Sequence, residues 1–206
     1  MLKFYLFNHP ERISEAQFQK ELLPQLPAWR QETALRFKFH SGRVLCAMAF
    51  ILLKDGLKND FGIDGPITFD YGAKGKPFLR NHPEIHFNLS HCKQGVLCVI
   101  DDQAPVGCDI ETLNRKVSDA LMRRTCNAAE LETIQHADDP TADFIRLWTI
   151  KEAVLKCSGE GITNDLKNLL NPNAIENLHI ETKVCQENGY AYTICQKRAI
   201  KQPDLG

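Results

Sequence analysis

Three acidic side chains stand in otherwise apolar surroundings and are the residues of this chain best suited to chemistry. Asp109 and Glu111 lie two positions apart in the strand-like run 107–111, and alternate side chains of a strand point to the same side. Glu152 lies in 148–156, where the helical pattern is apolar over most of its circumference. Because unpaired carboxylates are costly in apolar surroundings, we expect a positive partner, most simply a shared divalent cation.

Two simpler interpretations compete with a metal site. Glu152 and Lys156 are spaced four apart and could form a surface ion pair worth about 0.3–0.5 kcal/mol. Asp109 and Glu111 could face solvent, with the residues between them pointing inward. The arc of the helix around Glu152 is too apolar for a surface pair. Three carboxylates without a cluster of Cys or His favour Mg²⁺ or Mn²⁺ as the metal over zinc.

Cationic and polar residues near these acids in the sequence point to a phosphate ligand. Mg²⁺ held by few protein ligands usually completes its shell with water and substrate phosphate, and phosphate is bound by cations and N–H donors. Alone, His91 is more typical of a surface histidine, and the glycine-rich stretch 72–79 lacks the P-loop spacing and is more typical of a turn. The candidate phosphate contacts are Lys156, Lys76, Arg43, Ser90 and His91.

The hydrophobic pattern predicts helices and antiparallel strands that would position these residues. The predicted elements are strand 2–7, helix 14–23, helix 29–53, strands 67–71, 85–89, 95–101 and 106–112, a short helix opening at 127, helix 142–158, and strands 177–186 and 190–197. Gly56 and 59–60 are expected in a loop, and strands 85–112 in an antiparallel meander. Asn188-Gly189 predicts a tight hairpin.

Two similar halves follow from this order of elements. In each half a long buried helix precedes antiparallel strands, which predicts an α+β fold of two halves with a cleft between them. The boundaries are an N-terminal half, 1–104, and a C-terminal half, 105–206. The strand that carries Asp109 and Glu111 leads from one half to the other. A monomer is expected because the halves cover each other.

Composition sets the class of protein. The 206 residues carry a net charge of −1, so we expect neither nucleic acid nor an anionic membrane as partner. Eight Cys without a C-x-x-C spacing are typical of buried thiols in a reducing compartment. The amino-terminal apolar run is too short for a signal peptide, and cytoplasmic localisation is expected. Residues 202–206 are expected to form a loose tail.

Four short motifs together carry a specific resemblance. They are GKP at 75–77, FNLSH at 87–91, GCDIE at 107–111 and WTIKEAVLK at 148–156. In this order and spacing they resemble the signature of the 4'-phosphopantetheinyl transferases, in the longer single-chain type that activates nonribosomal peptide synthetases such as surfactin synthetase. The resemblance implies a pseudo-dimer of α+β halves. The short trimeric type is about half as long and fits worse.

The resemblance also implies an activity of the holo-[acyl-carrier-protein] synthase kind. Such an enzyme moves phosphopantetheine from coenzyme A to a serine of an apo acyl or peptidyl carrier protein and releases adenosine 3',5'-bisphosphate. By resemblance, Asp109, Glu111 and Glu152 match the metal ligands. Lys156 matches the lysine that neutralises the pyrophosphate, and Glu152 or Glu111 matches the base. The positions matching coenzyme A contacts are Arg43, Lys76, Pro77, Ser90, His91 and Lys156.

This chain departs from the family after Pro27, where relatives carry lysines. Here Arg30, Arg36 or Lys38 would take over the contacts to the 3'-phosphate. A basic run beside the site would attract an acidic carrier helix, although it is also typical of a solvated loop. Its members are Arg115, Lys116, Arg123 and Arg124. Two other functions stay open: a Mg²⁺-dependent hydrolase of phosphodiesters or nucleotides, and a non-catalytic module that binds coenzyme A or a carrier.

Overall fold

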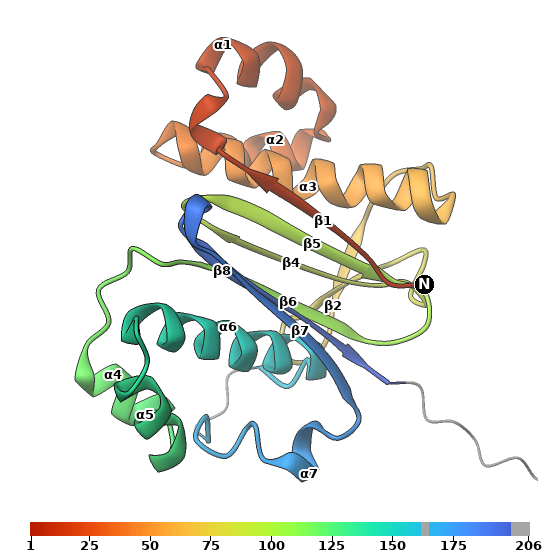
Figure 1. Cartoon of the computed structure of the whole chain (residues 1–206). Helices are drawn as coiled ribbons and strands as arrows, with labels where there is room; N and C mark the ends of the chain where they lie inside the picture. The colour runs from red at the N-terminus through yellow and green to blue at the C-terminus, as the bar shows by residue number, and fades with distance from the viewer. Residues whose placement is uncertain (162–164, 199–206) are drawn as a thin grey trace, which may run out of the picture.

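Two three-stranded antiparallel sheets lie between two long helices in the computed structural model, which describes residues 1–161 and 165–198; β2 and β3 pair in a separate two-stranded sheet. Figure 1 shows α3 covering one side of the strands and α6 the other. The predicted α+β class is therefore confirmed. The loose tail predicted at 202–206 lies outside the described residues.

The first sheet has the strand order β1-β5-β4, with β1 (Lys3–Asn8), β4 (His86–Cys92) and β5 (Gly95–Asp101). The helix α3 (His40–Phe61) lies between β1 and β4 in sequence and packs on β5 and β1. Strand β5 is buried along its whole length. Its apolar side chains therefore form much of the core under α3.

The second sheet repeats this connection order, β6-β8-β7. Its strands are β6 (Val106–Thr112), β7 (Leu178–Cys185) and β8 (Tyr190–Lys197). Helix α6 (Pro140–Ser158) lies between β6 and β7 in sequence and packs on β6 and β8. In both sheets the first strand, before the helix, pairs with the last strand of the group.

The remaining elements connect or cover these two units. They are η1 (Pro10–Arg12), α1 (Glu15–Gln17), η2 (Phe18–Leu22), η3 (Leu23–Gln25), α2 (Ala28–Leu35), β2 (Phe69–Tyr71), β3 (Pro77–Leu79), α4 (Asp119–Thr125), α5 (Ala128–Gln135), α7 (Pro172–Ile175) and η4 (Gln186–Asn188). Helix α5 begins with the predicted capping box, in which Asn127 accepts from the Glu130 N–H and Glu130 accepts from the Asn127 N–H. Helix α6 is ended by Gly159, which adopts the left-handed conformation with φ 73°.

The predicted helix 29–53 is right at its start and wrong in its middle and at its C-terminal end. The chain breaks between α2 and α3, and α3 continues to Phe61 before Gly62 ends it. Gly56, expected in a loop, lies inside α3. A Cβ at this position would come within 2.6 Å of the Tyr5 ring, so only glycine fits here. The glycine thus lets the helix approach β1 closely. Its low helix propensity is outweighed by this packing.

The predicted meander ends after two strands. Strand β5 pairs with β4, but β6 leaves that sheet and pairs with β8. Side chains of β4 take over the contact to β6: the Cys108 N–H donates to Asn88 Oδ1 at 2.8 Å, and the Ile110 N–H donates to Ser90 Oγ at 3.3 Å. The two sheets are therefore joined by side chains in place of a ladder of main-chain hydrogen bonds.

The cysteines form no disulfide among the described residues, and seven of the eight are buried. This confirms their interpretation as small apolar core residues. None of the described helices is long and apolar enough to cross a membrane.

Candidate active site

The three acids lie on two elements that pack on each other. Asp109 and Glu111 are on β6, and Glu152 is on α6. The close packing depends on Gly107, because a Cβ there would lie 2.2 Å from the Ala153 carbonyl oxygen and 2.3 Å from the Cys157 nitrogen. The glycine brings the middle of α6 against the strand, and the predicted grouping of the acids follows from this contact.

Asp109 is the centre of a buried polar cluster. Only 6% of the residue is exposed. Its Oδ1 accepts hydrogen bonds from Lys156 Nζ at 2.6 Å and Ser90 Oγ at 2.8 Å, and Lys156 Nζ also lies 3.2 Å from Ser90 Oγ. Lys156 therefore pairs with Asp109, and the interpretations as a Glu152–Lys156 surface pair and as a solvent-facing Asp109 are wrong.

Glu111 is held by a different cation. Arg115 Nη1 donates to its Oε2 at 3.0 Å, and the Thr112 N–H donates to its Oε1 at 3.0 Å. The Arg115 guanidinium lies over the Trp148 ring, 5.5 Å from the ring centroid. Arg115, expected to face a carrier protein, is thus engaged with the acid site in this structure.

Glu152 has a perturbed pKa. Burial raises the pKa of its carboxyl above the usual range, and the negative charges of Asp109 and Glu111 raise it further, whereas Lys156 lowers it. The three carboxylates are therefore close enough to repel one another. Such repulsion is what a bound cation would relieve.

The donor set fits a hard divalent cation. No group of three His, Cys, Asp or Glu side chains is arranged to hold a metal ion in residues 1–161 and 165–198. Lys156 and Arg115 hold two of the three carboxylates. Three oxygen donors whose charges destabilise one another match the chemistry of Mg²⁺ or Mn²⁺. Binding would require these cations to give way.

A cavity of about 320 Å³ lies beside the acids. It has walls from the loop before β3, from β4 and from the last turns of α6. Its lining residues are Lys74, Gly75, Lys76, Pro77, Asn88, Glu152, Leu155, Lys156, Gly159 and Gly161. Four predicted site residues thus line one cavity: Lys76, Pro77, Glu152 and Lys156.

Lys76 points its ammonium group into the protein. Its Nζ donates to the carbonyl oxygens of Val106 at 2.9 Å, Lys156 at 2.6 Å and Cys157 at 3.2 Å. Two of these carbonyls belong to the end of α6, where a cation is favourable to the helix dipole. Burial lowers the pKa of Lys76. In this structure Lys76 therefore fixes the backbone that carries Lys156.

His91 and Arg30 are brought together near the cluster. The pKa of His91 lies below its usual range because the surrounding protein desolvates the ring and because Lys156 and Arg30 are close cations. Arg30 donates to the Cys46 carbonyl at 3.2 Å, while its buried Nε has no hydrogen-bond partner among the described residues. This pair of cation and ring offers donors for an anion.

Arg43 is placed differently from the other predicted residues. Its Nε donates to the Phe37 carbonyl at 3.0 Å, and its Nη1 lies 3.6 Å from a Glu15 carboxylate oxygen. Arg43 therefore links the start of α3 to α1. The structure shows no contact between Arg43 and the acids in the described part of the chain.

Asn88 is a site residue that the sequence reasoning missed. It lines the cavity and accepts from the β6 backbone. Asn88 and Ser90 are two apart on β4, so they share a side of that strand, as Asp109 and Glu111 do on β6. This shared spacing of two residues could have identified Asn88 as a neighbour of the site.

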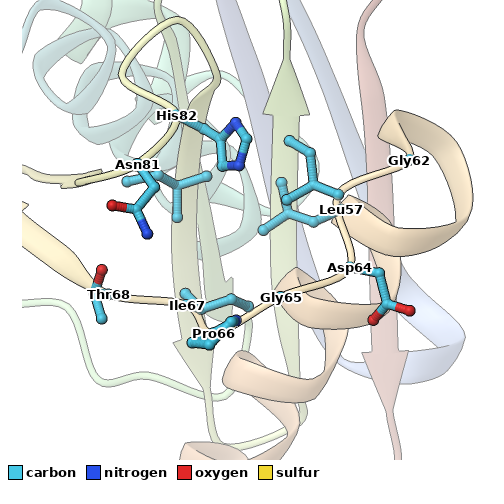
Figure 2. A pocket seen from close by; sticks show the side chains of 11 residues that line it. Leu57, Gly62, Asp64, Gly65, Pro66, Ile67, Thr68, Asn81 and His82 are labelled. Carbon is cyan, nitrogen blue, oxygen red and sulfur yellow. The ribbon is translucent and has the colours of Figure 1, made fainter.

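A second cavity, of about 350 Å³, lies at the end of α3 and the following loop. Figure 2 shows Asn81 and His82 across from Pro66 and Ile67, with the Asp64 carboxylate turned away from the space. Asp64 pairs with Lys58 at 2.9 Å. None of the predicted site residues lines this cavity.

The other basic residues of the predicted docking run are exposed. Lys116 precedes α4, and Arg123 and Arg124 occupy its last turn. No ion pair of these three side chains is found in the described part of the chain. They are available to an acidic surface.

Comparison with known proteins adds sequence similarity to this geometry. The profile of the 4'-phosphopantetheinyl transferase superfamily matches residues 105–198. The 4'-phosphopantetheinyl transferase HetI of Nostoc sp. is 32% identical over 166 residues, which cover 77% of this chain and 69% of HetI. A 4'-phosphopantetheinyl transferase of Bacillus subtilis is 27% identical over 156 residues, covering 74% of this chain and 69% of the relative.

A third relative, psf-1 of Bacillus pumilus, is also named a 4'-phosphopantetheinyl transferase. It is 32% identical over 150 residues, and the match spans 71% of this chain and 64% of psf-1. The match to the family profile includes the segment from β6 to β8, which carries all three acids and Lys156. This chain belongs to the 4'-phosphopantetheinyl transferase superfamily.

Proposed function

We propose that this protein transfers the 4'-phosphopantetheine group of coenzyme A to a serine of an apo acyl or peptidyl carrier protein, as a holo-[acyl-carrier-protein] synthase. Adenosine 3',5'-bisphosphate is the second product. The observation that carries the proposal is the cluster in which Lys156 and Ser90 meet Asp109, at 2.6 and 2.8 Å, with Glu152 on the adjoining cavity. Membership of the transferase superfamily supports the same activity.

The proposed metal ligands are Asp109, Glu111 and Glu152. Bound Mg²⁺, or Mn²⁺, would neutralise the coenzyme A pyrophosphate and offset the charge that develops on the leaving group. The repulsion that raises the pKa of Glu152 supports this assignment. Carboxylate oxygens with room for phosphate and water suit the preference of Mg²⁺ for few protein ligands.

Each remaining residue has a distinct proposed role. Lys156 leaves Asp109 to hold the pyrophosphate of coenzyme A, and it offsets the charge that builds on the departing adenosine 3',5'-bisphosphate. Phosphoryl transfer depends on such charge neutralisation more than on covalent help from the protein. Glu152 or Glu111 accepts the proton of the incoming serine hydroxyl, a contribution of about 10²–10⁴-fold. Ser90 and His91 donate to the phosphates, with Arg30 beside them.

The loop before β3 is proposed to hold the nucleotide end of coenzyme A. Pro77 and the backbone of Lys76 line the cavity, while the Lys76 ammonium supports the end of α6. Arg43 is proposed to hold the nucleotide only after its pairing with Glu15 is given up. Arg36 and Lys38, in the same connection between α2 and α3, are the other candidates for the 3'-phosphate.

We further propose that residues 1–104 and 105–206 are the two halves of a pseudo-dimer, with the active site between them. The shared connection order of the two sheets supports this, as does the position of Ser90 on β4 and Asp109 on β6. The enzyme is proposed to act as a monomer in the cytoplasm. Sedimentation equilibrium tests the monomer.

The carrier protein is proposed to approach the segment between β6 and α5. Lys116, Arg123 and Arg124 are exposed there and would attract an acidic helix. At physiological ionic strength such steering acts over about 8–10 Å. The serine nucleophile comes from the carrier, so the docked surface must lie beside Glu152.

Incubation with coenzyme A, Mg²⁺ and a panel of apo carrier proteins from fatty-acid, polyketide and peptide synthesis tests the function. Intact mass spectrometry should show a carrier heavier by one phosphopantetheine group. Asp109→Ala should abolish this gain, since it removes the partner of both Ser90 and Lys156. Consumption of coenzyme A without any carrier would instead indicate a hydrolase, and metal-independent binding without turnover a binding module.

A further inference from the structure

Arg115 occupies the position of a counter-cation at Glu111. Its Nη1 lies 3.0 Å from Glu111 Oε2, while the Thr112 N–H donates to the other carboxylate oxygen at 3.0 Å. Both oxygens of this carboxylate are therefore engaged. A guanidinium stays protonated at any working pH, so it can release Glu111 only by moving.

The guanidinium is held from the α6 side as well. It lies over the Trp148 ring, 5.5 Å from the centroid, and Trp148 is one helical turn before Glu152 on α6. Stacking on an aromatic face together with a carboxylate contact is a geometry that arginine satisfies and lysine does not. Arg115 therefore bridges the two elements that carry the acids.

We propose that Arg115 is an internal counter-cation that competes with the divalent metal for Glu111 and so sets the metal affinity of the site. The inference rests on the proposed function, because it uses the assignment of Glu111 as a metal ligand. Lys156 has the same relation to Asp109 at 2.6 Å, but Lys156 has a role of its own in transfer. Arg115 has no role in the proposed transfer itself. Its effect is to determine whether the Glu111 carboxylate is available to the metal.

The position of Arg115 extends the inference to the carrier. Its side chain is 36% exposed and directly precedes Lys116 in the proposed docking run. An acidic carrier helix that draws the guanidinium outward frees Glu111. Because linkage is reciprocal, carrier docking and metal binding then strengthen each other.

Titration with Mn²⁺, alone and with coenzyme A present, tests the inference without any turnover. Free Mn²⁺ is read by electron paramagnetic resonance for the wild type, Arg115→Gln and Arg146→Gln. Arg146 is the matched control, because it pairs with Asp143 at 2.9 Å and is 35% exposed, on α6 but away from the acids. Removing a half-exposed competing cation should tighten Mn²⁺ binding about two- to fivefold for Arg115→Gln, with no change for Arg146→Gln.

The outcomes separate this inference from the proposed function. Wild-type Mn²⁺ binding that Arg115→Gln leaves unchanged or weakens overturns the inference alone. Absence of Mn²⁺ binding from wild type and variant alike overturns the metal assignment together with it. Arg115→Lys keeps the charge without the stacked guanidinium and should give an intermediate affinity, which guards against a folding defect in Arg115→Gln.

Discussion

At the scale of single residues, Asp109 and Glu152 are carboxyls of the same site in opposite electrostatic situations. Asp109 is buried but accepts from Lys156 and Ser90, so its charge is compensated. Glu152 is half-buried beside two other negative charges, and its pKa is raised. In the ligand-free protein, ionised Glu152 is therefore the carboxylate that destabilises the fold. A carboxyl with a raised pKa beside a cavity is typical of functional sites.

Replacing Glu152 with Gln should stabilise the ligand-free protein while stopping transfer. A carboxyl whose pKa is raised on folding destabilises the fold above its folded pKa, and this cost fades as pH falls toward the ordinary value of 4.5. We therefore expect Glu152→Gln to have a higher Tm than wild type at pH 8 and no advantage near pH 4. Transfer should fall by about 10²–10⁴-fold.

Calorimetry across pH and the intact-mass assay provide the two measurements. Glu132→Gln is the matched control, since Glu132 is an exposed glutamate of α5. A Tm for Glu152→Gln that equals wild type at pH 8, or a lower one, contradicts the electrostatic cost. Undiminished transfer contradicts the assignment as base and ligand.

The sequence predicted that Asp109, Glu152 and Lys156 lie close together, but it did not predict which carboxylate pairs with Lys156. The spacing of Asp109 and Glu111 gives one side of a strand, because alternation is a local property. Which cation meets Asp109 depends on how α6 crosses β6, and that crossing is set by the close approach at Gly107. The i,i+4 partner of Lys156 was available locally, yet the buried Asp109 was the stronger electrostatic partner.

At the scale of elements, a buried lysine fixes the α4–α5 segment on α6. Lys151 is 2% exposed, and its Nζ donates to the Thr125 carbonyl at 2.7 Å, to Glu130 Oε2 at 2.7 Å and to the Leu166 carbonyl at 2.8 Å. All three protons of the ammonium are thus used. The capping residue of α5 and the end of α4 are therefore tied to the helix that carries Glu152.

Lys151→Met should destabilise the protein by about 3–5 kcal/mol, because it leaves the Glu130 carboxylate without its cation in a largely buried position. Urea denaturation measures the loss. Arg146→Gln breaks an exposed pair on the same helix and should cost at most about 1 kcal/mol. If both variants lose the same small amount, Lys151 is not the tie described here. Lys151→Met with Glu130→Met should recover much of the stability, since apolar replacement of a buried pair is often neutral.

The predicted element boundaries are right where nearby residues determine them and wrong where tertiary packing does. The helix starts at Ser14 and Asn127 and the helix end at Ser158 could be predicted, because the caps there involve residues within a few positions. The extension of α3 through Gly56 was not, because it depends on contact with Tyr5, far away in sequence. Strand β6 was placed correctly, but its partner β8 was not deducible from a local turn.

At the scale of the whole molecule, the two sheets meet where the site is. Asn88 and Ser90 of β4 accept from the β6 backbone, and Ser90 donates to Asp109. The side chains of Asn88 and Ser90 therefore join the two sheets, and Ser90 also contacts Asp109. Lys76 adds a second tie, from the loop before β3 to the start of β6 and the end of α6. Any loosening of this junction should alter the stability and the site together.

Lys76→Met separates two explanations of that lysine. If its ammonium only contacted coenzyme A, the variant would bind coenzyme A more weakly and unfold like wild type. The three carbonyls around Nζ instead predict a loss of about 2–4 kcal/mol in the ligand-free protein. Hydrogen bonds from a charged donor contribute about 1.5–3 kcal/mol each, and the cost of burying the ammonium offsets part of their sum.

Urea denaturation without coenzyme A makes the distinction, with Lys74→Met as control. Lys74 lines the same cavity but is exposed, so its replacement should change stability by no more than about 0.5 kcal/mol. Equal stability of the two variants would remove Lys76 from the junction and return it to the ligand. A selective loss in Lys76→Met would mean that a lysine of the loop before β3 positions the end of α6 that carries Lys156. The junction of loop, strand and helix would then be a condition for the proposed transfer.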